Sequence, residues 1–267
     1  MKKTAALSLA LLCTSLLFIQ CEKEKSGLIS KDQEIQFGEQ LDSLIINSPD
    51  EYNVLNENDH YDAYAYMNNI MNKILTSGYL NRKEYFNWTI RIIDEDVLNA
   101  FAAPGGYLYF YTGLMAYLDN EAQLAGVMAH EIAHVDRRHS AQQLERELAL
   151  STIVSIILGE NSSQLEQYAA SLAKGLSDLA YSRKHEYEAD EYAVKYTSDT
   201  DYNPRGISGF FIKMEEATTE EHTPEFLNTH PDPGNRLDAI DEVWESLGSP
   251  DGLDYEAEYN IFLGYLP

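Results

Sequence analysis

Three residues near the middle of the chain have the types and spacing for metal chemistry. His130, Glu131 and His134 form the pattern H-E-x-x-H inside residues 120–139, whose apolar positions predict a helix. At 3.6 residues per turn, the two histidines lie one turn apart on the same helix face. Two imidazoles placed in this way can bind one tetrahedral metal ion, and the glutamate beside them can then accept a proton. The same pattern also occurs on ordinary amphipathic helices, so it needs support from the rest of the chain.

A catalytic zinc ion typically has three protein ligands and one open position for water. The H-E-x-x-H pattern supplies two, so the third ligand must come from another element. A later segment, predicted to be helical, is rich in suitable side chains: His185, Glu186, Glu188 and Asp190. Spacing alone does not choose among these four residues.

The elements that must position these residues are mostly helical. Apolar periodicity predicts helices over residues 30–47, 59–76, 120–139, 163–197 and 206–217, and another that ends near residue 247. The apolar run 148–158 is short for a membrane span and predicts a buried helix. Alternation over 86–92 predicts a strand, and residues 99–102 and 107–111 flank a Pro-Gly-Gly turn, which indicates a hairpin. The expected fold class is α+β, mainly α, with a small antiparallel sheet packed on the H-E-x-x-H helix.

The charge balance argues against one class of partner. The chain of 267 residues has 44 acidic and 19 basic side chains, a formal net charge of −25. A surface of this charge repels phosphate backbones, so nucleic acid is not expected as a partner. The sequence does not predict the oligomeric state.

The N-terminal segment predicts export. Lys2 and Lys3 precede an apolar run over residues 5–19, as in a signal peptide, and this run is short for a membrane span. We therefore expect residues 1–20 to be a signal peptide. A retained N-terminal anchor is the alternative interpretation.

The apolar run ends at a cysteine. Cys21 follows the residues LFIQ, which resemble a bacterial lipoprotein cleavage box, although Gln20 stands where a small residue is usual. Cleavage there would leave Cys21 as the sole thiol, so no internal disulfide could form. We expect Cys21 to be lipidated, residues 21–30 to form a tether, and the protein to be anchored by its lipid in the periplasm or at the outer membrane.

Several separate motifs resemble those of the M48 metallopeptidase family, in the order in which that family has them. They are Asn99-Ala100-Phe101-Ala102 before Pro104-Gly105-Gly106, Thr112-Gly113-Leu114, His130-Glu131-Ile132-Ala133-His134 with Arg138-His139, Ser182-Arg183 before Glu186-Tyr187-Glu188-Ala189-Asp190, and Thr229-His230-Pro231 with Arg236. The resemblance runs from about residue 35 to residue 245. It is far more specific than the metal pattern alone. The family includes HtpX-type and CAAX-prenyl proteases and periplasmic BepA- and LoiP-type proteases. No stretch resembles the membrane spans of the first group or the helical repeats of BepA, so we expect a minimal exported member.

This resemblance implies a zincin-like domain with one zinc ion per chain. The implied ligands are His130, His134 and Glu186, the last being the first Glu of the family's E-x-x-A-D pattern. Glu131 is then the catalytic base, and Asp190 supports the site from behind the ligands. We expect the metallopeptidase domain over residues 31–248 and a C-terminal tail over residues 249–267.

Further roles follow from the same resemblance. His230 is the candidate that stabilises negative charge on the substrate oxygen or gates the metal; the alternative is a capping or packing histidine. Arg236 is expected to brace the site through an acidic partner, and Glu188 is left as a surface or structural residue. An edge strand above the zinc should present the substrate through main-chain hydrogen bonds. Its residues are Asn99, Ala100, Phe101 and Ala102.

The expected function is that of a zinc metalloendopeptidase acting on polypeptides, in particular unfolded or misassembled cell-envelope proteins. The alternative is a zinc-binding, chaperone-like periplasmic lipoprotein with latent or no peptidase activity. Glu131 and all three implied ligands are present, which favours the peptidase.

Overall fold

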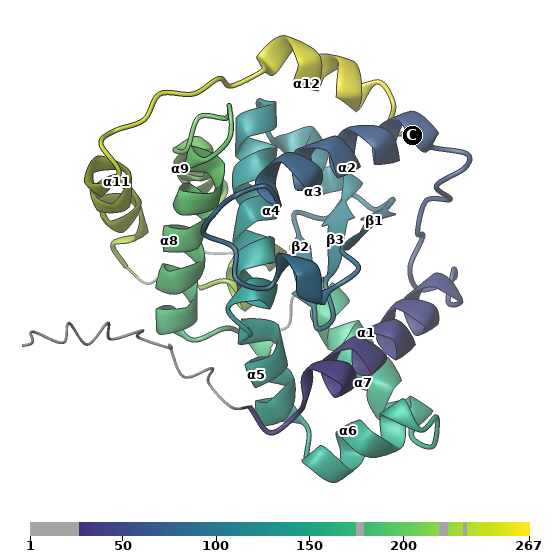
Figure 1. Ribbon diagram of the computed structural model, residues 1–267. Helices are drawn as coiled ribbons and strands as arrows, with labels where there is room; N and C mark the ends of the chain where they lie inside the picture. The colour runs from purple at the N-terminus through teal and green to yellow at the C-terminus, as the bar shows by residue number, and fades with distance from the viewer. Residues whose placement is uncertain (1–26, 175–178, 219–223, 232–233) are drawn as a thin grey trace, which may run out of the picture.

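The computed structural model describes residues 27–174, 179–218, 224–231 and 234–267 (Figure 1). The predicted signal peptide and Cys21 lie outside these residues. The first helices are α1 (Lys31–Ile46), α2 (Tyr61–Ile74) and the 3₁₀ turn η1 (Lys83–Tyr85). Three strands follow, β1 (Thr89–Ile93), β2 (Ala100–Ala103) and β3 (Tyr107–Tyr111). The remaining helices are α3 (Thr112–Tyr117), α4 (Glu121–Asp136), α5 (His139–Glu147), α6 (Leu150–Ile157), α7 (Ser162–Ala173), α8 (Arg183–Ser198), α9 (Gly206–Ala217), α10 (Glu225–Thr229), α11 (Arg236–Ser246) and α12 (Glu256–Leu263).

The strands form one mixed sheet in the order β1-β3-β2. β2 and β3 pair antiparallel, which confirms the predicted hairpin, whereas β1 pairs parallel with β3. The sheet is therefore mixed, and the wholly antiparallel sheet that we expected from the sequence is wrong. Alternating apolar residues indicate which face of a strand is buried, but they do not indicate its partner or direction. This order leaves β2 at an edge of the sheet.

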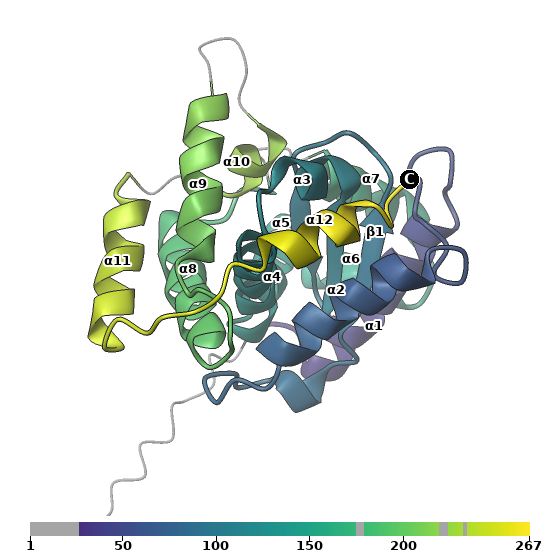
Figure 2. The same ribbon diagram turned by 90° about the horizontal axis from the view of Figure 1, so that it is seen from above.

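Helix α4, which carries H-E-x-x-H, lies between the sheet and a layer formed by α8 and α9 (Figures 1 and 2). Each residue of α4 is buried. Close packing on α9 requires a glycine, because a Cβ at Gly126 would lie 2.5 Å from the backbone nitrogen of Ile207. A helix covered on all sides cannot leave its polar side chains in water, so those side chains need partners inside the protein.

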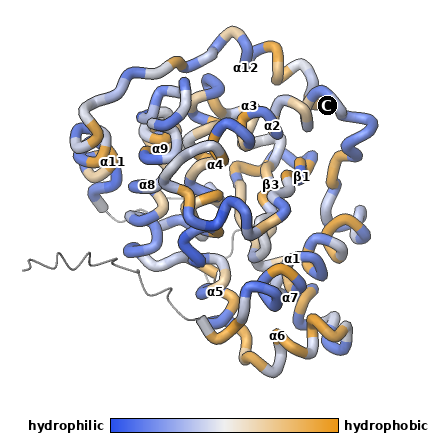
Figure 3. Tube along the Cα trace, in the orientation of Figure 1, coloured by the Kyte–Doolittle hydropathy of each residue, from blue (hydrophilic) through white to orange (hydrophobic). Residues whose placement is uncertain are grey.

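Helix α6 confirms that the apolar run 148–158 is helical, but the helix is only partly buried, whereas the sequence predicted a buried one. Ile153 and Ile156 are buried, but Leu150 and Leu158 remain 41% and 66% exposed. In the hydropathy view, much of α6 has the hydrophobic colour (Figure 3). None of the helices in the described ranges combines the length and hydropathy needed to cross a membrane.

Two predicted helices are each divided. Residues 120–139 form α4 and the start of α5, because Arg138 adopts a left-handed conformation with φ of 65°. Residues 163–197 fall in α7 and α8 rather than in one helix. The C-terminal segment, predicted as a tail, contains α12, whose Tyr259 and Phe262 are fully buried in the main core.

Candidate metal centre

Four buried side chains from three elements bring metal-binding atoms together. His130 and His134 come from α4, Glu186 from the first turn of α8, and His230 from the residue after α10. One ligand atom of each lies within 4.8 Å of the others, and all four residues are 0% exposed. Spacing had left four candidates for the third ligand, and the fold selects Glu186. His185, Glu188 and Asp190 are not in this group, although all three lie on the same helix.

The distances between these atoms fit a tetrahedral ion. Nε2 of His130 lies 3.0 Å from Nε2 of His134 and 3.3 Å from Nδ1 of His230. Oxygens of Glu186 lie 3.4 to 3.6 Å from the three imidazole nitrogens. Ligands about 2.05 Å from a tetrahedral zinc lie about 3.3 Å from one another. The donor set of three nitrogens and one carboxylate therefore has both the chemistry and the spacing that zinc requires.

An arginine and an aspartate hold two of the donors in place. Asp190 Oδ1 lies 2.9 Å from Nδ1 of His130, on the side of the ring that faces away from the other donors. Arg236 donates from Nε to Asp190 at 2.7 Å and from Nη2 to Glu186 at 2.5 Å. Carboxylates behind metal-binding histidines fix their tautomer and orientation. The geometry thus agrees with the bracing that the sequence suggested for Arg236.

The electrostatics of the donor cluster favour a positive ion. Burial would raise the pKa of Glu186, but His230 and His130 outweigh this and hold the pKa well below its usual range. Burial would lower the pKa of His130, but Asp190 and Glu186 raise it to about 9. The protein therefore keeps a carboxylate at the centre of the cluster and attracts positive charge towards it.

Glu131 lies beside the cluster and not within it. Its carboxylate is 3.5 Å from Nε2 of His230, and both of its oxygens keep acceptor capacity that the described residues do not use. Burial raises the pKa of this carboxyl group, with His230 and His130 opposing the rise. A buried carboxylate with unused acceptor atoms, one step from a metal cluster, is suited to accept a proton.

The predicted substrate strand lies next to this glutamate. β2 begins at Ala100, packs on α4, and its Ala102 backbone N–H opposes the rise in the pKa of Glu131. Asn99 accepts a hydrogen bond from the backbone of Tyr111. In an antiparallel pair, bonded residues alternate, so Ala100 and Ala102 turn their main-chain groups away from β3. Ala100 and Ala102 are both buried in this structure. A peptide can therefore pair with this edge of β2 only after the residues that cover it have moved.

Residues 65–244 match the sequence profile of peptidase family M48. This chain belongs to that family. The β-barrel assembly-enhancing protease of Escherichia coli (strain K12) is 34% identical over 158 residues, which cover 55% of this chain and 32% of the relative. The corresponding protease of Yersinia pestis is 29% identical over 183 residues, 64% of this chain and 37% of the relative. Mitochondrial metalloendopeptidase OMA1 of Bos taurus is 32% identical over 169 residues, 59% of this chain and 32% of the relative.

The M48 assignment and the buried cluster together identify a metalloendopeptidase. The matched regions span only about a third of the length of these curated relatives. The substrates and partners of the full-length relatives therefore cannot be assigned to this chain from the match alone.

The structure adds a residue to this M48 site that the sequence did not single out. The ring of Tyr181 stacks on His134 with centroids 3.7 Å apart, and its backbone N–H donates to Thr229. Tyr181 is one of nineteen tyrosines and precedes the Ser182-Arg183 motif, so no spacing signal marks it. Its ring and that of Phe226 in α10 pack on His134 and His230, two of the donors.

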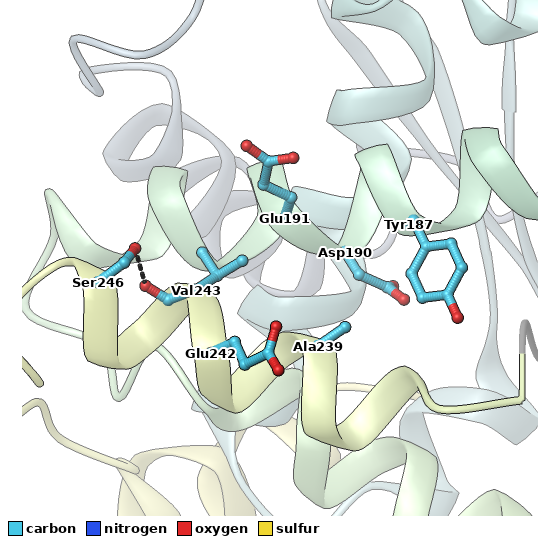
Figure 4. A pocket seen from close by; sticks show the side chains of 7 residues that line it. All are labelled: Tyr187, Asp190, Glu191, Ala239, Glu242, Val243 and Ser246. Carbon is cyan, nitrogen blue, oxygen red and sulfur yellow. Dashed lines mark hydrogen bonds between the residues drawn. The ribbon is translucent and has the colours of Figure 1, made fainter.

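A pocket on the outer side of α8 is separate from the donors (Figure 4). Its volume is about 340 Å³, and residues of α8 and α11 line it: Tyr187, Asp190, Glu191, Ala239, Glu242, Val243 and Ser246. None of the four donor residues lines it, and Glu131 does not either. Asp190, which contacts His130, is one of the residues that line it.

Proposed function

We propose that this M48 metalloendopeptidase uses one zinc ion per chain to cleave unfolded or misassembled proteins of the cell envelope. The observation that carries the proposal is the convergence of four donors beside a glutamate with unused acceptor atoms. A bound zinc ion supplies Lewis-acid chemistry, which acidifies water and polarises a peptide carbonyl group.

The proposed ligands are His130, His134 and Glu186, and the remaining residues do the proton and positioning work. Glu131 accepts the proton of the attacking water on its carboxylate and then delivers it to the nitrogen of the leaving amine. Asp190 and Arg236 keep the donors oriented throughout.

We assign His230 a gating role in this arrangement. Its Nδ1 is 3.3 Å from Nε2 of His130 and 3.4 Å from Glu186, so with zinc bound His230 would compete with water as the fourth ligand. Gating is one of the two roles predicted from the sequence; the other, stabilising negative charge on the substrate oxygen, requires the ring to leave this position first.

The substrate class is supported by the strand beside Glu131. Main-chain pairing with Ala100 and Ala102 would bind an extended peptide with little dependence on its side chains, which suits unfolded segments. Two of the relatives carry the name β-barrel assembly-enhancing protease, which supports substrates in the cell envelope. The N-terminal pattern supports export and lipidation at Cys21. Mass analysis of the mature N-terminus tests lipidation at Cys21: the wild type should carry the added mass of the lipid, and the control Cys21→Ala should not.

Proteolysis of an unfolded casein tests the activity. We expect the wild type to cleave it, and Glu131→Gln to lose about 10²–10⁴-fold in rate while keeping its zinc. Cleavage by Glu131→Gln at the wild-type rate would overturn the assignment of the base. An inactive chaperone would bind unfolded chains equally well with either residue, whereas a protease should retain substrate longer in Glu131→Gln.

A further inference from the structure

A second histidine, His139, contacts the metal donor His134 on the side of its ring that faces away from the other donors. Nδ1 of His139 lies 3.2 Å from Nδ1 of His134, the ring nitrogen that faces away from the other donors. Nε2 of His139 lies 3.4 Å from a carboxylate oxygen of Glu188. Arg137 donates from Nε to the other oxygen of this carboxylate at 2.9 Å. The contacts thus lead from a donor histidine, through a second imidazole, to a carboxylate near the surface.

Only one arrangement of protons satisfies each of these contacts. A metal at Nε2 of His134 leaves the ring proton on Nδ1, which must donate to Nδ1 of His139. His139 then carries its own proton on Nε2, which faces Glu188. Ionised Glu188 can only accept, so it fixes this tautomer of His139 and, through it, the tautomer of His134 that binds metal.

The two donor histidines of α4 therefore receive the same kind of support in different ways. Asp190 contacts Nδ1 of His130 directly, at 2.9 Å. Glu188 reaches His134 only through the interposed ring of His139. Both carboxylates come from α8, two positions apart.

The backbone and the packing hold the interposed ring in place. In a continuous helix, a residue five positions after His134 would lie about 140° around the axis from it. The left-handed Arg138 ends that helix and turns His139 back towards His134. His139 is fully buried and stacks on His185, with centroids 4.3 Å apart and planes 11° apart.

We propose that Glu188 and His139 are positioning residues that fix His134 for metal binding. The sequence predicts only a surface or structural place for Glu188 and no role for His139. This inference rests on the proposed zinc site. It concerns how tightly and in what geometry the site binds metal, so zinc affinity tests it independently of peptide cleavage.

The experiment measures zinc affinity by competition with a chromophoric chelator. The variants are Glu188→Gln, Glu188→Ala and His139→Phe, the last of which keeps an aromatic ring against His185. The matched control is Glu191→Gln, which removes a carboxylate from the exposed side of the same helix. We expect His139→Phe and Glu188→Ala to bind zinc about tenfold or more weakly, because outer partners of metal ligands have effects of this size. Glu188→Gln should lose less, since its amide oxygen can still accept, and Glu191→Gln should match the wild type.

A second measurement separates positioning from folding. The visible spectrum of the cobalt-substituted protein reports the ligand field, so it should change in Glu188→Ala and His139→Phe but not in Glu191→Gln. If both variants bind zinc as tightly as the control and differ only in the thermal stability of the metal-free protein, the inference is overturned. If the wild type itself shows no zinc affinity, the proposed function fails as well. Glu188 is only half-buried, so Glu188→Ala and Glu188→Gln should fold even if His139→Phe does not. The test can then be made with the two Glu188 variants alone.

Discussion

Nδ1 of His230 lies 3.3 Å from Nε2 of His130, at the distance expected for two ligands of one tetrahedral ion. The ring of Phe226 stacks on His230, with centroids 4.2 Å apart, and helps to hold it there. A histidine from a loop thus completes a site whose other donors lie on two packed helices. Zinc bound by all four residues would have no position left for water.

Replacing His230 by alanine should therefore increase activity. Three donors remain, so zinc should stay bound, and the fourth position becomes open to water. We expect faster cleavage of unfolded casein by His230→Ala than by the wild type, measured at equal zinc content. A loss of about 10²-fold or more would instead show that His230 stabilises charge on the substrate oxygen and does not act as a gate.

The position of α9 on the motif helix depends on a glycine. A Cβ at Gly126 would clash with the backbone of Ile207, which cannot move without displacing α9. We expect Gly126→Ala to lower the free energy of unfolding by about 1–3 kcal/mol, measured by urea denaturation. Gly78→Ala is the control, since the nearest atom to its Cβ would be 3.7 Å away, in the side chain of Asp199. Equal stability of the two variants would argue against this packing.

A buried carboxyl group outside the donor cluster should make stability depend on pH. Burial raises the pKa of Glu34 to about 7, with Arg138 opposing the rise. The folded protein therefore keeps Glu34 protonated at a pH where the unfolded chain has lost that proton. The resulting stability is present below the ordinary carboxyl pKa and is lost as pH rises towards 7.

Glu34→Gln removes this dependence. The wild type should lose stability between pH 5 and pH 8, whereas Glu34→Gln should not. The free energy of unfolding of Glu34→Gln minus that of the wild type should therefore rise over this range, by up to about 3 kcal/mol. Thermal melts of both proteins across this range provide the measurement. A difference that stays constant with pH would show that Glu34 is ionised in the folded protein throughout.

The metal-binding pair could be predicted from the sequence because both histidines lie on one element. Their spacing within a helix fixes their geometry before any tertiary contact forms. Glu186 follows the second histidine by 186 − 134 = 52 positions. Local spacing could not choose it over Glu188 or Asp190, because the choice depends on how α8 packs on α4. Resemblance to the family supplied that choice, and the fold places Glu186 accordingly.

Other features depended on tertiary structure that leaves little trace in the sequence. The left-handed Arg138 is not a glycine or an asparagine, so nothing in the sequence marks the end of α4, and the role proposed for His139 depends on that break. The alternation in β1 indicated a half-buried strand, but its parallel pairing with β3 arises from the hairpin lying beside it. The burial of Tyr259 likewise depends on the packing of α12 in the main core.

Zinc content tests the central claim most directly. Elemental analysis of the purified protein should find about one zinc ion per chain in the wild type and in Glu131→Gln, because the base is not a ligand. Glu186→Ala should retain little zinc under the same conditions, since it removes the only donor from α8. A wild type without zinc, or Glu186→Ala with a full complement of it, would contradict the account.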